Sequence, residues 1–271
     1  LIGYEGQYWK MIQPFFDYMG ATERSGSQED VSFQCEIKLD HVSFKYPNHE
    51  TSALDGISLT IKKGEVIAIV GENGAGKTTL ANIVLGLFLP SSGEVYYDGR
   101  NIEEVSESRL HRMQSVVSQS FVRYKMSVRD NIAIADFGRM DEKWVEQGYR
   151  SFLDGSQLSL DTMLGKEFGG QDLSSGQWQQ LACVRGFYKD SDFVVLDEAT
   201  SAIDPLKEKA MYDSFRRGLE GRTGIIVTHR LGAVSLADRI VVLEHGRIVQ
   251  EGTHRELLNE DGVYVQLWNA Q

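Results

Sequence analysis

One stretch of the chain carries its strongest structural signal: Val66-Ile67-Ala68-Ile69-Val70-Gly71-Glu72-Asn73-Gly74-Ala75-Gly76-Lys77-Thr78-Thr79. The uninterrupted apolar run at its start predicts a strand that is buried on both faces. The glycines that follow predict a tight loop, and the apolar spacing from Leu80 onward predicts a helix. The stretch therefore predicts a strand, a loop and a helix in succession.

The loop has the spacing of a phosphate-binding P-loop, in which Gly71 is followed by four residues and then by Gly76, Lys77 and Thr78. In such a loop backbone N–H groups surround the phosphates, the lysine reaches the terminal ones and the hydroxyl holds Mg²⁺. A glycine-rich turn that fits the pattern by accident is the alternative, and the flanking strand and helix disfavour it. The predicted nucleotide contacts are Gly71, Asn73, Gly74, Ala75, Gly76, Lys77, Thr78 and Thr79.

The bulk composition is that of an ordinary globular protein, with 41% hydrophobic and 25% charged residues among 271. It excludes disordered, collagen-like and disulfide-rich classes. The net charge of -11 argues against a nucleic-acid partner, because such binding needs clustered Lys and Arg to neutralise phosphates. The two cysteines, Cys35 and Cys183, have no metal-ligand spacing and suit a reducing compartment.

The N-terminal region predicts a link to a further part of a longer polypeptide. No stretch approaches the ~20 apolar residues of a membrane span, so we expect the chain as given to be soluble. It starts at Leu1 without a secretory pattern, and we expect it to be cut from a longer polypeptide. Residues 9–18 are rich in aromatic side chains, and residues 21–34 are polar and typical of a linker.

Strands and helices alternate along the rest of the chain, which predicts a mainly parallel central sheet. Further strands are predicted at 36–44, 57–61, 93–97, 115–118, 193–196, 224–228, 240–243 and 247–250. Helices are predicted at 174–188, 205–219 and 256–268, and over most of 127–164.

The apolar strand at 193–196 delivers two adjacent carboxylates, Asp197 and Glu198, to its carboxyl end. Asp197 is suited to hold Mg²⁺ through water, and Glu198 to orient or deprotonate an attacking water. Paired acids at a strand end are often only a solvated turn, but a P-loop in the same chain favours the catalytic interpretation.

Leu173-Ser174-Ser175-Gly176-Gln177 opens the helix predicted at 174–188. Ser174 is suited to cap that helix, and the N–H groups exposed there are suited to bind an anion. Taken alone, the segment predicts no more than a good helix start.

In this order, the motifs resemble those of the nucleotide-binding domain of an ABC transporter, over nearly all of residues 31–271. By this resemblance Tyr46 stacks on adenine, Gln119 is the Q-loop glutamine and His229 is the switch histidine. Residues 173–177 correspond to the signature motif and residues 201–204 to the D-loop. The alternatives are an edge-strand aromatic for Tyr46, a surface residue for Gln119, and a capping or core residue for His229.

The resemblance implies an α/β fold with a P-loop NTPase core and mainly parallel sheet, an antiparallel β subdomain and a helical subdomain at about 120–188. It implies ATP hydrolysis with Mg²⁺. The catalytic residues it implies are Glu198, His229, Gln119 and Lys77, and the Mg²⁺ ligands are Thr78, Gln119 and Asp197. Beyond the P-loop, the implied nucleotide contacts are Tyr46, Ser174, Ser175, Gly176, Gln177 and Asp204.

Ser175 departs from the family pattern, which has glycine at this position of the signature. In the family the motif reaches the γ-phosphate of the nucleotide held by the opposing subunit, so a side chain here would weaken or reposition that contact. If the position required a positive φ, serine would add a backbone cost of about 1 kcal/mol. We expect reduced closure at most, because Ser174, Gly176 and Gln177 remain.

Two segments favour the exporter branch of the family. Residues 165–169 resemble the exporter loop that touches the coupling helices of the membrane domain, and residues 1–30 resemble the linker or elbow from an absent transmembrane domain. Residues 170–180, with Trp178, are similar to peptide or lantibiotic exporters. The implied partners are a second nucleotide-binding domain, as homodimer or heterodimer, and a transmembrane domain at the cytoplasmic side of the cell membrane.

Two other functions are alternatives to the exporter motor. Non-transport ABC proteins commonly carry a long coiled coil or two fused motors, whereas about 100 residues without a sustained heptad separate Lys77 from Ser174. A nucleotide-binding regulatory module that does not hydrolyse ATP is disfavoured by the presence of Glu198 and His229.

Overall fold

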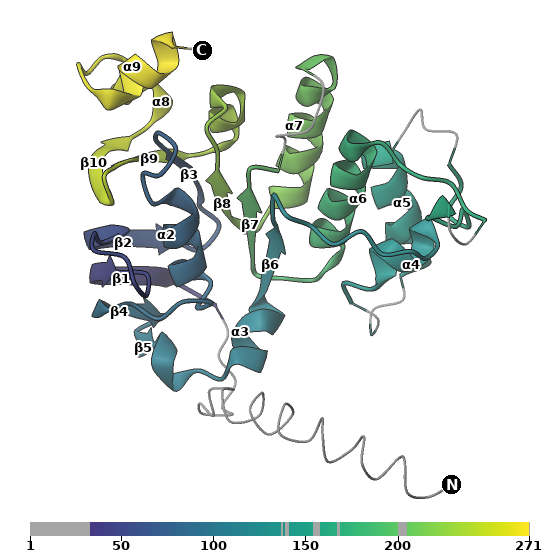
Figure 1. The fold of residues 1–271 in the computed structure, drawn as a ribbon, viewed down its shortest axis with the longest axis horizontal. Coiled ribbons are helices and arrows are strands. Elements are labelled where there is room, and N and C mark those ends of the chain that lie inside the picture. The colour runs from purple at the N-terminus through teal and green to yellow at the C-terminus, as the bar shows by residue number, and fades with distance from the viewer. Residues whose placement is uncertain are drawn as a thin grey trace, which may run out of the picture.

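The computed structural model describes residues 33–136, 138, 141–153, 158–166, 169–199 and 205–270. Within these ranges the chain forms two sheets with helices between and beside them (Figure 1). The predicted segment at 1–30 and the predicted D-loop at 201–204 lie outside the described residues, so the domain boundaries stay a prediction.

The larger sheet is mainly parallel, as the sequence predicts, with the order β10-β9-β3-β8-β7-β6. Its strands are β3 (Val66–Val70), β6 (Gln114–Val117), β7 (Phe193–Asp197), β8 (Thr223–Val227), β9 (Arg239–Glu244) and β10 (Arg247–Gly252). Only the β9–β10 pairing is antiparallel among those described in this sheet. The parallel strands end at one edge, which places the loops after β3, β6, β7 and β8 together.

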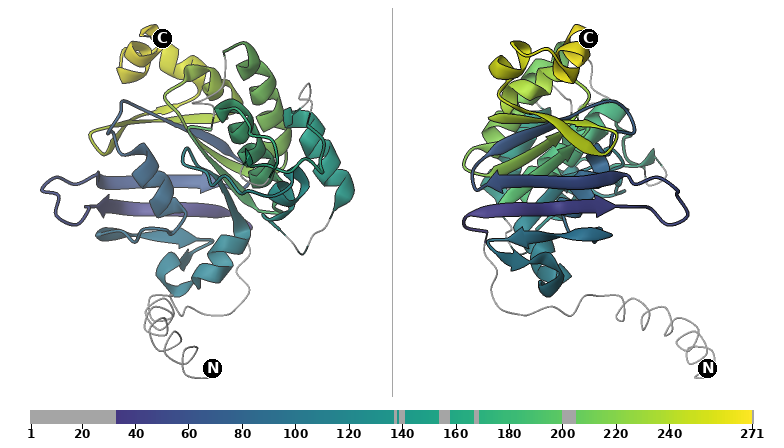
Figure 2. Two further views of the ribbon diagram at one scale, coloured as in Figure 1. Left: turned by 45° about the vertical axis from the view of Figure 1, so that its right-hand side comes forward. Right: turned by 90° about the vertical axis from the view of Figure 1, so that its left-hand side faces the viewer.

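The smaller sheet is antiparallel and has the order β2-β1-β4-β5. Its strands are β1 (Glu36–Phe44), β2 (Leu54–Lys62), β4 (Ser92–Tyr97) and β5 (Arg100–Asn101). Figure 2 shows these strands side by side, with β1 and β2 drawn in purple and dark blue. The antiparallel subdomain implied by the resemblance is therefore confirmed.

Helix α2 (Lys77–Val84) joins the two sheets through a shared core. Its Leu80 and Ile83 are fully buried in the same cluster as Ile37 of β1, Leu59 of β2 and Ile225 of β8. Full burial of each such side chain stabilises the fold by roughly 1.5–3 kcal/mol. The helix that follows the P-loop is thus fixed between the sheets.

Seven further α-helices are described, together with two 3-10 turns. They are α3 (Glu107–Met113), α4 (Val128–Ala133), α5 (Glu142–Leu153), α6 (Ser175–Tyr188), α7 (Pro205–Leu219), α8 (His254–Leu258) and α9 (Val263–Asn269), with 3-10 turns at Ile102–Glu104 and Leu231–Leu236. Helices α4 and α5 lie with α6 at one end of the molecule (Figure 1). No helix of the described ranges is long and apolar enough to cross a bilayer.

Two helix predictions are wrong in extent. The predicted helix at 256–268 is instead α8 and α9, because Thr253 caps α8 from its own start and Gly262 is fully extended with φ 176 before α9. Within the segment 127–164, the described residues that are helical belong to α4 and α5. Leu164 donates its N–H to Met126 O and Val128 donates to Thr162 O, so residues 160–164 pair with the start of α4.

Candidate nucleotide site

The loop between β3 and α2 has the geometry of a phosphate cradle. Gly76 has φ 102, and a Cβ on it would lie 2.6 Å from the backbone oxygen of Ala53. A Cβ on Gly71 would lie 2.2 Å from the backbone oxygen of Leu243. Because backbone atoms stand in the way, no side chain fits at either position.

The N-terminus of α2 is open to an anion. Gly76 occupies the cap position, and no side chain caps the helix there. The first N–H groups of a helix have no partner inside it and carry its positive dipole end, so they favour phosphate. The nucleotide contacts assigned to residues 71–79 stay a prediction, and this open helix start is compatible with it.

Lys77 bends back over this loop. Its Nζ donates to the backbone oxygens of Gly71 and Glu72, both at 2.9 Å. Burial lowers the pKa of Lys77, although the carboxylates of Glu198 and Asp197 oppose that shift. The ammonium therefore interacts electrostatically with both acids at the end of β7, and its contact with terminal phosphates stays a prediction.

Thr78 and Asp197 form the position suited to a magnesium ion. Thr78 Oγ1 donates to Asp197 Oδ1 at 3.2 Å across 119 positions of sequence. Burial raises the pKa of Asp197, so its carboxylate lacks solvation that a cation would replace. In the described part of the chain no group of three or more His, Cys, Asp or Glu is set to hold a metal. Mg²⁺ takes one or two protein oxygens together with phosphates and waters, and its place at Thr78 and Asp197 stays a prediction.

Glu198 and His229 meet beside this position. His229 Nδ1 lies 3.1 Å from Glu198 Oε1, and the carboxylate side chain is 18% exposed. The pairing follows from the sheet, because Asp197 of β7 lies in register with Val227 of β8, two residues before His229. A carboxylate fixed in this way is suited to orient or deprotonate a water.

Gln119 lies past the same edge of the sheet. It is exposed, two residues after β6, whose last residue Val117 lies in register with Leu196 of β7. Its assigned role as a magnesium ligand stays a prediction.

Tyr46 belongs to an aromatic group next to α2. Its hydroxyl lies 3.0 Å from Thr79 Oγ1, and its ring packs against Phe44 and Phe88 with ring centroids 5.0 and 5.8 Å away. The half-buried ring is thus held beside the P-loop helix. This position suits the adenine-stacking role that the resemblance implies.

Replacing Tyr46 by Ala is expected to raise the Michaelis constant for ATP about fivefold or more, since stacking contributes about 1 kcal/mol or somewhat more. The maximal rate should change little, because stacking on adenine does not involve the proposed catalytic acids Asp197 and Glu198. Tyr46→Phe is the matched control, since it keeps the ring and removes only the bond to Thr79. A collapsed maximal rate with an unchanged Michaelis constant in steady-state assays would rule out stacking.

The signature segment forms the exposed start of α6. Ser174 Oγ accepts from the N–H of Gln177 at 3.2 Å, and Gln177 Oε1 accepts from the N–H of Ser174 at 2.9 Å. This capping box occupies two donors at the helix end. Ser175 is the first residue of the helix and has no positive φ, so the anticipated strain at this position does not arise.

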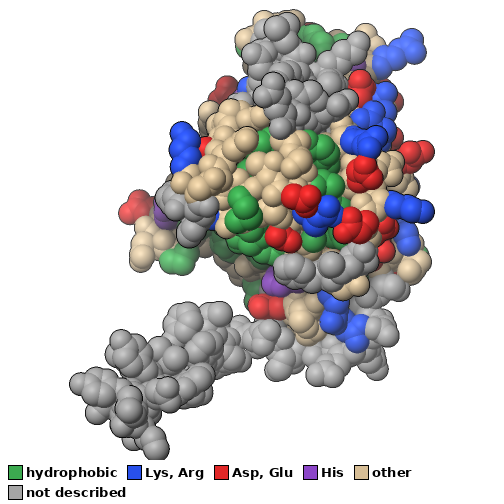
Figure 3. Space-filling view, turned by 90° about the vertical axis from the view of Figure 1, so that its right-hand side faces the viewer, with side chains coloured by type: hydrophobic (Ala, Val, Ile, Leu, Met, Phe, Trp, Pro, Cys, Tyr) green, Lys and Arg blue, Asp and Glu red, His purple; other side chains and the backbone are tan. Residues whose placement is uncertain are grey.

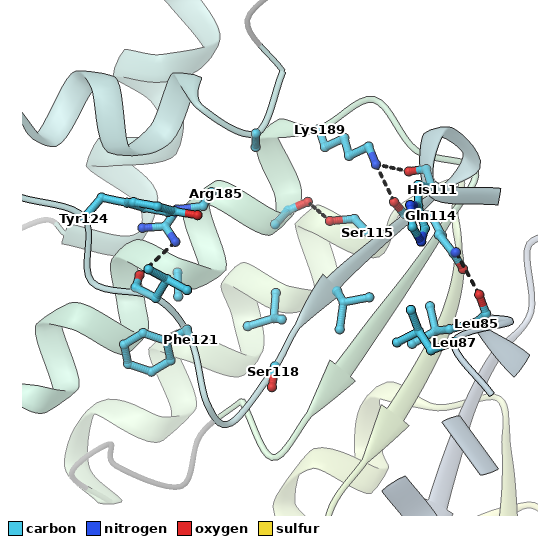
Figure 4. A pocket seen from close by; sticks show the side chains of 16 residues that line it. Leu85, Leu87, His111, Gln114, Ser115, Ser118, Phe121, Tyr124, Arg185 and Lys189 are labelled. Carbon is cyan, nitrogen blue, oxygen red and sulfur yellow. Dashed lines mark hydrogen bonds between the residues drawn. The ribbon is translucent and has the colours of Figure 1, made fainter. Parts of the chain in front are cut away.

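A groove that the sequence did not predict lies between the large sheet and α6 (Figure 4). Its volume is about 350 Å³. Val122 is 57% exposed there, and Arg185 of α6 donates to its backbone oxygen while stacking over Tyr124 at 4.8 Å. The sequence signal for this groove is the group of apolar and aromatic residues Phe121, Val122 and Tyr124 just after Gln119. Figure 3 faces the end of the molecule that carries α4 and α5, and it shows hydrophobic side chains at the surface there, bordered by charged ones.

A family comparison agrees with the described fold. A family model described as "ABC transporter" matches residues 54–201, and the chain belongs to this family. Membership implies ATP binding, which agrees with the P-loop and its neighbours.

The chain is similar to two curated relatives and to one solved structure of this family. The chain is 39% identical over 246 residues to an ATP-dependent lipid A-core flippase of Ralstonia nicotianae, which covers 87% of this chain and 41% of that protein. It is 36% identical over 245 residues to nisin transport ATP-binding protein NisT of Lactococcus lactis subsp. lactis, covering 87% and 40%. A bacterial Atm1-family ABC exporter solved with ATP bound matches with TM-score 0.84 and 28% identity, over 96% of this chain and 47% of that chain. The chain thus spans less than half the length of these relatives.

Proposed function

We propose that the chain is the ATP-hydrolysing motor domain of an ABC exporter. The observation that carries this proposal is the contact of 3.1 Å between Glu198 and His229, next to the P-loop lysine and the Thr78–Asp197 pair. The names of the relatives, a lipid flippase and a nisin transport protein, support the exporter branch.

The proposed reaction is phosphoryl transfer from ATP to water. Water attacks the γ-phosphorus, the bond from that phosphorus to the bridging oxygen breaks, and ADP and phosphate leave. Glu198 takes the proton from water, and His229 orients the Glu198 carboxylate. Lys77 and the N-terminus of α2 hold the phosphates. Thr78 and Asp197 would hold Mg²⁺, which would supply positive charge to neutralise the phosphates.

The proposed working unit is a pair of such domains, either two copies of this chain or this chain with a homologue. Two ATP molecules lie between the P-loop of one domain and the signature of the other, and hydrolysis reopens the pair. The exposed Ser174 and Ser175 at the start of α6 support this arrangement, since they are accessible to a facing domain.

The proposed membrane partner is a transmembrane domain of the same transporter, which places the motor at the cytoplasmic side of the cell membrane. The groove of Figure 4 supports this partner, because Leu87, Val116 and Val122 expose apolar surface along it. Glu167 and Phe168 of the predicted coupling loop lie outside the described residues.

The purified chain is expected to hydrolyse ATP with a specific activity that rises with protein concentration. Without a membrane domain, pairing depends on mass action alone. The measurement is phosphate release at saturating ATP and Mg²⁺ from nanomolar to high micromolar protein. No hydrolysis at any concentration would contradict the proposal. With a flat specific activity, sedimentation of Glu198→Gln with ATP would tell complete pairing from a monomeric enzyme.

A further inference from the structure

Glu198 has a backbone conformation that needs support from its surroundings. Its φ is 49, in the left-handed region that residues other than glycine rarely adopt. Both of its peptide groups are held by hydrogen bonds. Its N–H donates to Val227 O at 2.9 Å, and its carbonyl accepts from the side-chain amide of Gln179 at 3.2 Å.

The second of these bonds comes from helix α6. Gln179 is 1% exposed, so its amide is withdrawn from water and depends on partners inside the protein. One turn later Cys183 Sγ lies 4.0 Å from the carbonyl oxygen of Ala199. One face of α6 therefore lies along the backbone of residues 198 and 199.

The position of Gln179 on α6 links this contact to the signature. The capping box joins Ser174 to Gln177, and Gln179 follows two residues later in the same rigid helix. A shift of the helix start would therefore move the amide that holds the carbonyl of Glu198.

We propose that Gln179 is a positioning residue for Glu198, which fixes the backbone from which the carboxylate reaches His229 and so ties that carboxylate to the signature helix. This inference rests on the proposed function. Gln179 acts through Glu198 and has no contact of its own with the reaction. Losing the contact should let the Glu198 carboxylate drift from the attacking water without changing the P-loop.

The first test is Gln179→Met, which keeps the length of the side chain and removes the donor. We expect the maximal rate of ATP hydrolysis to fall at least about tenfold, because small misplacements of catalytic groups are costly. The Michaelis constant for ATP should stay within about twofold, since P-loop contacts are untouched. Gln180→Met, the same change one position along α6, is the matched control and should behave as the unaltered chain. An unchanged maximal rate in Gln179→Met overturns the proposal.

The second test separates positioning from a general loss of structure. In single-turnover measurements, Gln179→Met added to Glu198→Gln should cause no further loss, because the carboxylate it positions is already absent. If Gln179→Met lowers the rate of the Glu198→Gln variant by the same factor as it lowers the rate of the unaltered chain, the proposal is overturned. If Gln179→Met fails to fold, Gln179→Asn provides the same comparison with an amide that is one methylene too short.

The outcomes also separate this inference from the proposed function. If the unaltered chain hydrolyses ATP and Glu198→Gln abolishes it, the function stands whatever Gln179→Met does. If the unaltered chain does not hydrolyse ATP at any concentration, the function itself fails.

Discussion

Glu198→Gln is expected to keep ATP binding and to lower turnover by at least about a hundredfold. The substitution removes the base but preserves the shape of the side chain. Its amide can still meet His229, which lies 3.1 Å from the carboxylate. Lys77 and the helix N-terminus, which are proposed to hold the phosphates, are unchanged. Calorimetry measures ATP binding, and steady-state phosphate release measures turnover.

Glu220→Gln is a matched control for this prediction. It makes the same chemical change at an exposed position after α7, and turnover should stay as in the unaltered chain. The Glu198→Gln protein should also remain paired in ATP for longer, because the step that reopens the pair is blocked. Near-normal hydrolysis in Glu198→Gln would remove Glu198 from the role of base.

The strand and helix around the P-loop were predictable because the local sequence pattern determines both. Residues 66–70 are apolar without a break and form β3, buried on both faces. The glycines that a phosphate cradle requires have fixed spacing, so residues 71–79 could be placed without knowledge of distant contacts. The same holds for the acids at the end of β7.

The ends of the short C-terminal helices were harder to place. Apolar residues lie at 257–258 and again at 263–265 and 267–268, which favours one helix over 256–268. The capping box of Thr253 with Glu256 and the Asp261–Gly262 pair were readable signals for a helix start and a break. The pairing of residues 160–164 with the start of α4 depends on packing and has no local signal.

The contacts within the site depend on the fold rather than on spacing. Thr78 and Asp197 meet across 119 positions, and Glu198 and His229 across 31, because β3, β8 and β7 end at one edge. The motif resemblance could name these residues but could not supply their partners. The link from Gln179 to Glu198 was missed for this reason, since it crosses from a helix face to a strand end.

The proposed sharing of each site between two domains predicts that Lys77→Ala and Ser174→Arg are each inactive alone but recover hydrolysis when mixed. Lys77→Ala removes the cation at the terminal phosphates. Ser174→Arg places a bulky charge at the exposed start of α6, where the nucleotide of the facing domain would lie. In a mixed pair one site carries both lesions, and the other joins an intact P-loop to an intact signature.

Phosphate release from the mixture measures the recovery, and crosslinking shows whether mixed pairs form. The matched control mixes Lys77→Ala with the double variant Lys77→Ala/Ser174→Arg, a pair that has no intact P-loop and should stay inactive. Because Ser174 also caps α6, thermal unfolding must show that Ser174→Arg is folded; losing such a cap costs about 1 kcal/mol.

An inactive mixture in which mixed pairs form would leave two explanations. Either the two sites fire only together, or each signature serves the P-loop of its own chain. ATP-driven closure of the pair in the same mixture decides between them. A site shared between chains lets the mixed pair close on its one intact site, so closure should exceed that of either variant alone. A site built within one chain gives no reason for that excess, and equal closure would therefore rule out the shared site.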